Sequence, residues 1–175
     1  MDFSRYTNKA QQSILKAQNL ASEYHHTVME SVHILVGLLE QQDGVVPQII
    51  QKIGARPATI RDELEGVLEN MPHTTNPPGN IQIGREGMQL LTRAEKEAKK
   101  MRDEYVSTEH IFLALTEDPD MGATLGRNGV NDDDILKALQ AIRGGQRVTS
   151  QDPETTYQSL EKFGRDLTAD ARQGK

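Results

Sequence analysis

Five histidines and a run of acidic residues are the side chains of this 175-residue chain whose types could support metal chemistry. His25, His26, His33, His73 and His110 occur in a chain with 26 Asp and Glu residues. The H-E-x-x-H pattern, which places two histidines on one helix face, is absent. His33 and His110 stand near the starts of apolar helical runs, where a ring nitrogen hydrogen-bonded to the backbone is the simpler role. We therefore predict structural histidines and no metal.

The acidic run Asn131–Asp134 has one feature of a calcium loop but lacks the rest of the pattern. An EF-hand loop needs a glycine at its sixth position and a glutamate at its twelfth. Counted from Asn131, these positions are Leu136 and Ile142. We therefore interpret the run as the start of a helix, with its carboxylates facing the positive end of the helix dipole.

Covalent and phosphate chemistry also lack their usual residues. The chain has no cysteine, no G-x-x-x-x-G-K-[ST] phosphate loop and no G-x-S-x-G elbow. Its serines, threonines and lysines have no evident neighbouring base. We predict a non-enzymatic chain with no cofactor of its own, and keep an enzyme or metal protein as the alternative that turnover or stoichiometric metal would reveal.

Composition narrows the class of partner. The 20 Lys and Arg residues against 26 Asp and Glu give a net charge of -6, which opposes binding to a phosphate backbone. No apolar stretch approaches the roughly 20 residues that a membrane span requires. The start, Met1–Arg5, lacks the basic flank and apolar run of a signal peptide. We expect a cytoplasmic protein without nucleic-acid or membrane partners.

An internal repeat organises the chain. A shift of 77 residues aligns apolar and polar positions without a gap, and the match resumes after a two-residue contraction. The aligned pairs are Ala17/Ala94, Ala21/Ala98, His33/His110, Ile34/Ile111, Leu38/Leu115 and Glu40/Glu117, and then Gly54/Gly129, Ile60/Ile135, Leu64/Leu139 and Val67/Ile142. Two similar units of this size predict a pseudo-twofold pair.

The periodicity within each copy is helical. Ala10, Ile14, Ala17 and Ala21 form one apolar stripe, and small residues in it allow a partner helix to approach closely. The same stripe recurs at Gly87, Leu91, Ala94, Ala98 and Met101, and the nearly continuous apolar runs 33–39 and 110–115 predict central helices. We expect four helices per copy and an all-α fold.

Helix boundaries are marked by glycine, proline and asparagine. Gly54 is expected to end one helix, and Pro57 suits the first position of the next. In the second copy Gly129 plays the part of Gly54, and Asn131 can cap the fourth helix. Gly144 with Gly145 should stop the last helix of the repeat.

These signals divide the chain into a domain over residues 1–145 and a linker over 146–175. Repeat one covers about 1–71, an inter-repeat loop 72–80, and repeat two about 81–145. The polar stretch 146–151 predicts a flexible joint. A further helix is expected after it, with a thin apolar stripe that needs another surface, on Tyr157, Leu160, Leu167 and Ala171. We expect the 175 residues to be a piece of a longer chain.

The order of repeat, linker and tail resembles the N-terminal domain of ClpB-type disaggregases. The segments that carry the resemblance are Tyr6–Ala10, Val106–Ile111 and Tyr157–Thr168. The resemblance implies a mobile domain that binds unfolded or aggregated polypeptides and passes them to the ATPase domains of the same chain. It further implies a homohexameric ring with ATP and Mg²⁺ in the full-length protein, and a DnaK-type chaperone system as a co-worker.

The resemblance also nominates residues for client binding. Polar handling is assigned to Thr7, Asp103 and Glu109, and groove lining to Leu91, Tyr105 and Val106. Each has a structural alternative: Thr7 as a helix N-cap, Asp103 and Glu109 as solvated acids near helix ends, and Leu91 as core. Tyr105 can present ring and hydroxyl together at a surface.

One departure separates two branches of this family. Domains of the ClpC type carry a Thr/Ser-Glu-His motif in both copies, and the paired glutamates help to receive phosphoarginine and adaptors. Here copy one reads Ser31-Val32-His33, while Glu109 stands in copy two. This favours a ClpB-type receptor, with a ClpC or ClpA-type receptor for adaptors or phosphoarginine as the alternative.

Overall fold

The computed structural model describes residues 2–154 and 157, which form eight α-helices and two very short strands. Repeat one contains α1 (Asn8–Glu23), β1 (Val28–Met29), α2 (Ser31–Leu39), α3 (Val45–Ile53) and α4 (Pro57–Asn70). Repeat two contains β2 (Gln82–Ile83), α5 (Arg85–Lys100), α6 (Thr108–Leu115), α7 (Pro119–Arg127) and α8 (Asp132–Arg143). The expected all-α class and the duplicated four-helix order are confirmed.

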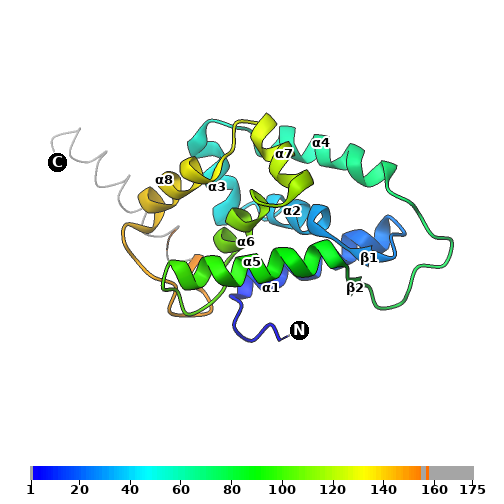
Figure 1. The fold of residues 1–175 in the computed structure, drawn as a ribbon, viewed down its shortest axis with the longest axis horizontal. Helices are drawn as coiled ribbons and strands as arrows, with labels where there is room; N and C mark the ends of the chain where they lie inside the picture. Colours follow the sequence, from blue (N-terminus) through cyan, green and yellow to red (C-terminus); the bar gives the residue numbers. More distant parts are fainter. Residues whose placement is uncertain (1, 155–156, 158–175) are drawn as a thin grey trace.

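The helices α2 and α6 occupy the centre of the molecule. α2 packs against α1, and α6 packs against α5, so that each repeat builds the same helix pair (Figure 1). α2 and α6 also contact each other, which joins the two repeats through one core. Every residue of α2 is buried, as the apolar run predicts. α3 of repeat one also packs on α8 of repeat two, so the outer helices add a further contact between the repeats.

The strands cross-connect the repeats, which the sequence did not predict. β1 and β2 pair in parallel, with Met29 opposite Ile83. Tyr6 forms a parallel bridge with Val106, and these two residues are the repeat equivalents of Ile83 and Met29 at the 77-residue shift. In each repeat, therefore, a residue that precedes the first helix pairs with the loop between the first two helices of the other repeat. This exchange holds the two halves as one body.

The caps agree with the local signals. Gly54 ends α3 in the left-handed region at φ 97°, and Gly144 ends α8 there at φ 59°. Pro57 is the first residue of α4, and the Asn131 side chain accepts a hydrogen bond from the backbone N of Asp134. None of the helices in the described residues has the length and apolar character needed to cross a membrane.

The polar stretch after α8 does not behave as the predicted flexible joint. Val148 is fully buried, its backbone N donates to Asp103 Oδ1 over 2.9 Å, and its carbonyl accepts from Glu104 N over 2.8 Å. The expectation was wrong because one apolar side chain and a distant carboxylate anchor a segment that looks featureless in sequence. Leu160, Leu167 and Ala171 lie outside the described residues.

Candidate functional site

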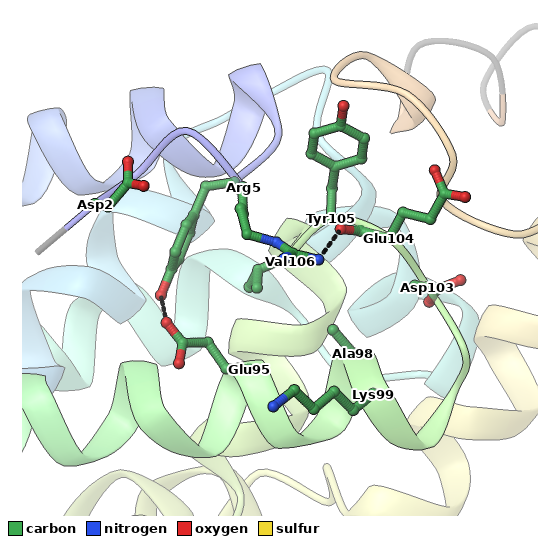
Figure 2. Close-up of a pocket in the computed structure, with 10 residues that line it drawn as sticks. Asp2, Arg5, Glu95, Ala98, Lys99, Asp103, Glu104, Tyr105 and Val106 are labelled. Atoms are coloured by element: carbon green, nitrogen blue, oxygen red, sulfur yellow. Dashed lines mark hydrogen bonds between the residues drawn. The ribbon is translucent and has the colours of Figure 1, made fainter.

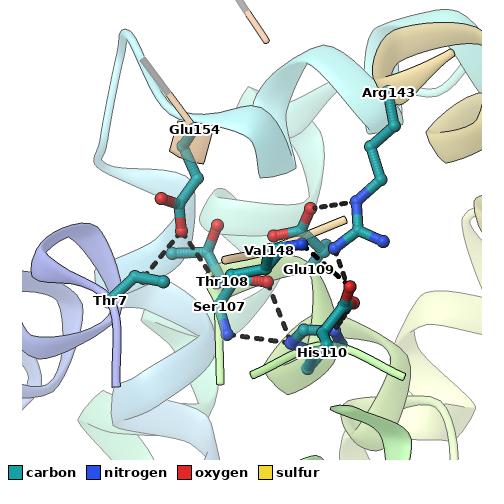
Figure 3. Close-up of polar contacts among 9 residues, drawn as sticks. Thr7, Ser107, Thr108, Glu109, His110, Arg143, Val148 and Glu154 are labelled. Atoms are coloured by element: carbon teal, nitrogen blue, oxygen red, sulfur yellow. Dashed lines mark hydrogen bonds and ion pairs between the residues drawn. The ribbon is translucent and has the colours of Figure 1, made fainter. Parts of the chain in front are cut away.

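A charged cluster at the start of α6 brings together residues from three parts of the chain: the loop before α6, α6 itself and the end of α8. Arg143, in the last turn of α8, pairs with Asp103 Oδ2 at 2.8 Å and with Glu109 Oε2 at 3.2 Å (Figure 3). The side chains of Asp103 and Glu109 are 0% exposed. The interpretation of these two residues as solvated acids was therefore wrong. Buried carboxylates of this kind need a partner, and Arg143 supplies it.

His110 completes this cluster by linking the backbone of Ser107 to the Asp103 carboxylate. Its Nδ1 accepts from the backbone N of Ser107 over 2.8 Å, and its Nε2 lies 2.7 Å from Asp103 Oδ2. The expected backbone role of this histidine is confirmed. Burial alone would raise the pKa of the Asp103 carboxyl, but hydrogen bonds from His110, Val148 and Arg143 hold it below its usual value.

Repeat one builds the same corner around two histidine rings. His33 Nδ1 accepts from Glu30 N, and its Nε2 lies 2.8 Å from His26 Nδ1, where His26 takes the place of Asp103. His26 Nε2 lies 3.1 Å from the carbonyl of Leu68, which can only accept, so the chain of bonds fits two neutral rings. Burial and the neighbouring His26 lower the pKa of His33 to about 4. The repeats thus keep one geometry with different chemistry.

A pocket of about 330 Å³ beside α5 holds three of the residues nominated for client binding. Asp103, Tyr105 and Val106 line it together with Arg5, Tyr6 and Glu95 (Figure 2). We call it the Tyr105 pocket. The Tyr105 side chain stands up from its loop, and its ring is partly buried against the core. Tyr6 donates its hydroxyl to Glu95 over 3.1 Å, so the wall is fixed by a hydrogen bond.

The other nominated residues are closed to contact. Thr7, Leu91 and Glu109 are each 0% exposed. Thr7 caps α1 by accepting from Ala10 N, which confirms the N-cap alternative. Leu91 belongs to the core, and this favours its structural alternative. The apolar stripe of residues 87–101 predicts that Leu91 lies on the buried face of its helix. For this residue, helical periodicity was therefore a better guide than the family resemblance.

A second hollow, which the sequence reasoning missed, runs along the outer face of α1. Its volume is about 500 Å³, and every side chain that lines it is uncharged: Phe3, Asn8, Gln11, Gln12, Ile14, Leu15, Gln18 and Ile83. We call it the α1 groove. Leu15 is 58% exposed there, and within the described residues this is a larger exposed fraction than that of Leu136 (43%) or Met88 (41%). The available signal was an apolar residue outside the buried stripe of α1, surrounded by glutamines.

The two hollows share the N-terminal segment 2–8 as a wall. Phe3 and Asn8 face the α1 groove, whereas Asp2, Arg5 and Tyr6 face the Tyr105 pocket. The rings of Phe3 and Tyr6 pack edge to face at 5.2 Å. No three His, Cys, Asp or Glu side chains gather into a metal site within residues 2–154 and 157.

The duplicated bundle matches a known domain family. A family model described as the Clp repeat (R) N-terminal domain matches residues 5–128. The chain belongs to this family. The match assigns the chain to the N-terminal domain and not to an ATPase module, in agreement with the missing phosphate loop.

Curated relatives of this Clp N-terminal domain include ClpB chaperones. The chain is 42% identical over 179 residues to the chaperone protein ClpB of Bacillus cereus, and 37% identical over 181 residues to that of Nitratidesulfovibrio vulgaris. Each alignment covers 100% of this chain and 21% of the relative. The chain therefore spans about a fifth of the length of these relatives.

Solved structures share the fold at lower identity. The Hsp104 N-terminal domain from Candida albicans matches with a TM-score of 0.77 and 24% identity, covering 86% of this chain and 99% of that domain. The N-terminal domain of the ClpV1 ATPase from E. coli matches with a TM-score of 0.71 and 21% identity, covering 87% and 92%. A ClpV N-domain solved in complex with a VipB peptide matches with a TM-score of 0.59 and 16% identity, covering 82% and 90%.

Proposed function

We propose that this Clp N-terminal domain recognises exposed apolar segments of unfolded or aggregated polypeptides and delivers them to ATPase domains of the same chain. The proposal rests on the α1 groove, an open hollow in which apolar side chains alternate with uncharged amides and no charged side chain takes part in the lining. Misfolded clients share exposed apolar segments whatever their sequence, so a receptor for them needs a tolerant apolar surface with few fixed polar demands. The α1 groove meets this requirement.

The Tyr105 pocket supplies a second contact beside it. Its lining mixes Tyr105 and Val106 with charged residues, so it can orient a segment whose flanks carry charge. A client that lies across the shared wall 2–8 would touch both hollows. The complex of a ClpV N-domain with a VipB peptide supports the idea that this fold can bind peptide segments. Assembly into a hexameric ring and cooperation with a DnaK-type system are parts of the same proposal for the longer protein.

The alternative receptor for phosphoarginine or adaptors has less support. Glu109 is the acid that would receive a guanidinium, and it is already paired with Arg143 inside the domain. The equivalent position in repeat one is Val32, which cannot accept a hydrogen bond from its side chain. Neither position offers a free carboxylate to a ligand in this structure.

Charge placed in either hollow should weaken client binding without unfolding the domain. We expect Leu15→Asp and Tyr105→Asp each to raise the Kd for a denatured model substrate by about tenfold, because each removes about 1.4 kcal/mol or more of apolar burial. Fluorescence anisotropy with a permanently unfolded, labelled polypeptide measures the Kd.

Met88→Asp is the matched control. Met88 is 41% exposed on α5 and lines neither hollow, so this variant should bind as the wild type does. Circular dichroism should show the same helix content for all four proteins. Equal binding by Leu15→Asp, Tyr105→Asp and the wild type would remove the support for both surfaces.

A further inference from the structure

The segment after α8 crosses both repeats and is held at each. Gln151 accepts from Asn8 N over 2.7 Å through its carbonyl, and its side chain donates to the Ser4 carbonyl over 3.1 Å. Val148 bonds to repeat two through its own backbone: its N donates to the Asp103 carboxylate, and its carbonyl accepts from Glu104 N. We call residues 146–154 the strap. It ties the start of α1 to the loop that precedes α6, and it is the part of the chain that continues toward any following domain.

The strap ends on a buried carboxylate that has no cation of its own. Glu154 is 0% exposed; its Oε1 accepts from the Thr7 hydroxyl over 2.7 Å and from Thr108 N over 3.4 Å. Its Oε2 has no hydrogen-bond partner, and neither has Oε1 of Glu109. Arg143 serves Asp103 and Glu109 and makes no ion pair with Glu154 among those found in the described residues.

Around Glu109, the buried carboxyl groups of Asp103, Glu109 and Glu154 therefore outnumber the one buried guanidinium, that of Arg143. The groups that face Glu154 come from every element packed against it (Figure 3). They are Thr7 at the N-cap of α1, Thr108 and Glu109 in α6, and Tyr157 after the strap. Arg143 in α8 and Asp103 are the other charged groups around Glu109. Asp103, Glu109 and Glu154 are the three buried carboxylates here, and a proton on Glu154 removes one of their negative charges. On Oε2, which has no hydrogen-bond partner, the proton also turns an acceptor into a donor.

We propose that the strap is a proton-operated latch, closed over Glu109 and Thr7 while Glu154 carries a proton and loosened when Glu154 ionises. Opening uncovers the start of α6 and frees the strap from α1. Residues 146–154 then become part of the free segment that follows α8, so this segment is longer in the open state than in the closed state. The latch concerns attachment of the domain, and so it does not depend on the proposed client binding.

The direction of the pH response follows from the two states of Glu154. Burial, and then the charge of Glu109, raise the pKa of Glu154 from 4.5 to about 7 in the closed strap. The closed state therefore binds the proton more tightly than an open, solvated strap does. Closure is fully favoured below pH 4.5, and it weakens as the pH rises toward 7, by up to about a hundredfold in the closing equilibrium.

Amide hydrogen exchange can follow the latch directly, because three backbone amides bond across it. They are Asn8 N, Glu104 N and Val148 N. In the 175-residue chain, their protection factors, corrected for intrinsic exchange, should fall by up to about a hundredfold from pH 5 to pH 7.5. In Glu154→Gln, which keeps the amide neutral at every pH, protection should not change over this range.

Glu117→Gln is the control, because Glu117 is an exposed acid at the end of α6. It should respond to pH as the wild type does. A core amide such as that of Leu35 should keep its protection throughout. Equal pH responses in the wild type and Glu154→Gln, or loss of protection at Leu35 together with the strap amides, would overturn the latch.

A second measurement needs no variant. The side-chain carboxyl carbon of Glu154, followed by NMR in the wild-type chain, should titrate near pH 7. Titration near 4.5, the ordinary value of a solvated glutamate, would overturn the proposal even if Glu154→Gln failed to fold.

Discussion

Arg143→Met should lower the free energy of unfolding by about 3–5 kcal/mol, because it leaves Asp103 and Glu109 as buried carboxylates without a cation. The methionine can fill the space of the arginine stem, so the loss is mainly electrostatic. Arg143 is 6% exposed and holds both acids at once. Urea unfolding at pH 7, followed by circular dichroism, measures the change.

Arg127→Met is the matched control for this prediction. Arg127 occupies the last turn of α7 as Arg143 does in α8, but its side chain is 61% exposed; it forms an ion pair with Glu63 and donates a hydrogen bond to the Thr124 hydroxyl. We expect a loss below about 1 kcal/mol. In a double variant, Glu109→Gln should recover part of the loss caused by Arg143→Met, since one uncompensated charge is removed. Equal losses in the two arginine variants would mean that the cluster is not buried as described.

Gly37→Ala should destabilise the fold by about 1–3 kcal/mol or more, because the added methyl group has no room. A Cβ on Gly37 would lie 2.5 Å from the carbonyl oxygen of Ser13 on α1. That atom belongs to helix backbone and cannot move without separating α1 from α2. Thermal unfolding should show a lower Tm for this variant.

Gly66→Ala is the control of opposite sign. Gly66 lies within α4, and a Cβ there meets nothing within 4 Å. Replacing a mid-helix glycine with alanine should stabilise the domain by about 0.5–1 kcal/mol. If Gly37→Ala were neutral, α1 and α2 could not pack as closely as the structure has them.

The fold could be predicted well from the sequence because the pattern of each helix occurs twice, once in each repeat. The 77-residue shift relates not only the helices but also the left-handed corners at His25 (φ 57°) and Arg102 (φ 58°). Local signals such as Gly54, Pro57 and Asn131 act within a few residues, so a single sequence can reveal them. The parallel pairing across the repeats has no such signal, since each strand is only two residues long.

The site was predicted less well because burial there depends on distant partners. Nothing near Asp103 or Glu109 shows that Arg143, at the end of the last repeat helix, will cover both. The strap looks polar and featureless, yet Val148 and Glu154 are fully buried. Conversely, Leu15 resembles core in type but lies on the outer face of α1. Residue type and spacing predict helices, whereas these positions are decided by tertiary packing.

Client recognition through the two hollows can be observed residue by residue in an NMR titration. The ¹⁵N-labelled chain would be titrated with a permanently unfolded apolar polypeptide, and the amide shifts followed residue by residue. Saturable shifts should appear at Leu15 and Gln18 in the α1 groove and at Tyr105 and Val106 in the Tyr105 pocket. No saturable shift at these residues, or shifts confined to the far side around Met121, would contradict the proposed function.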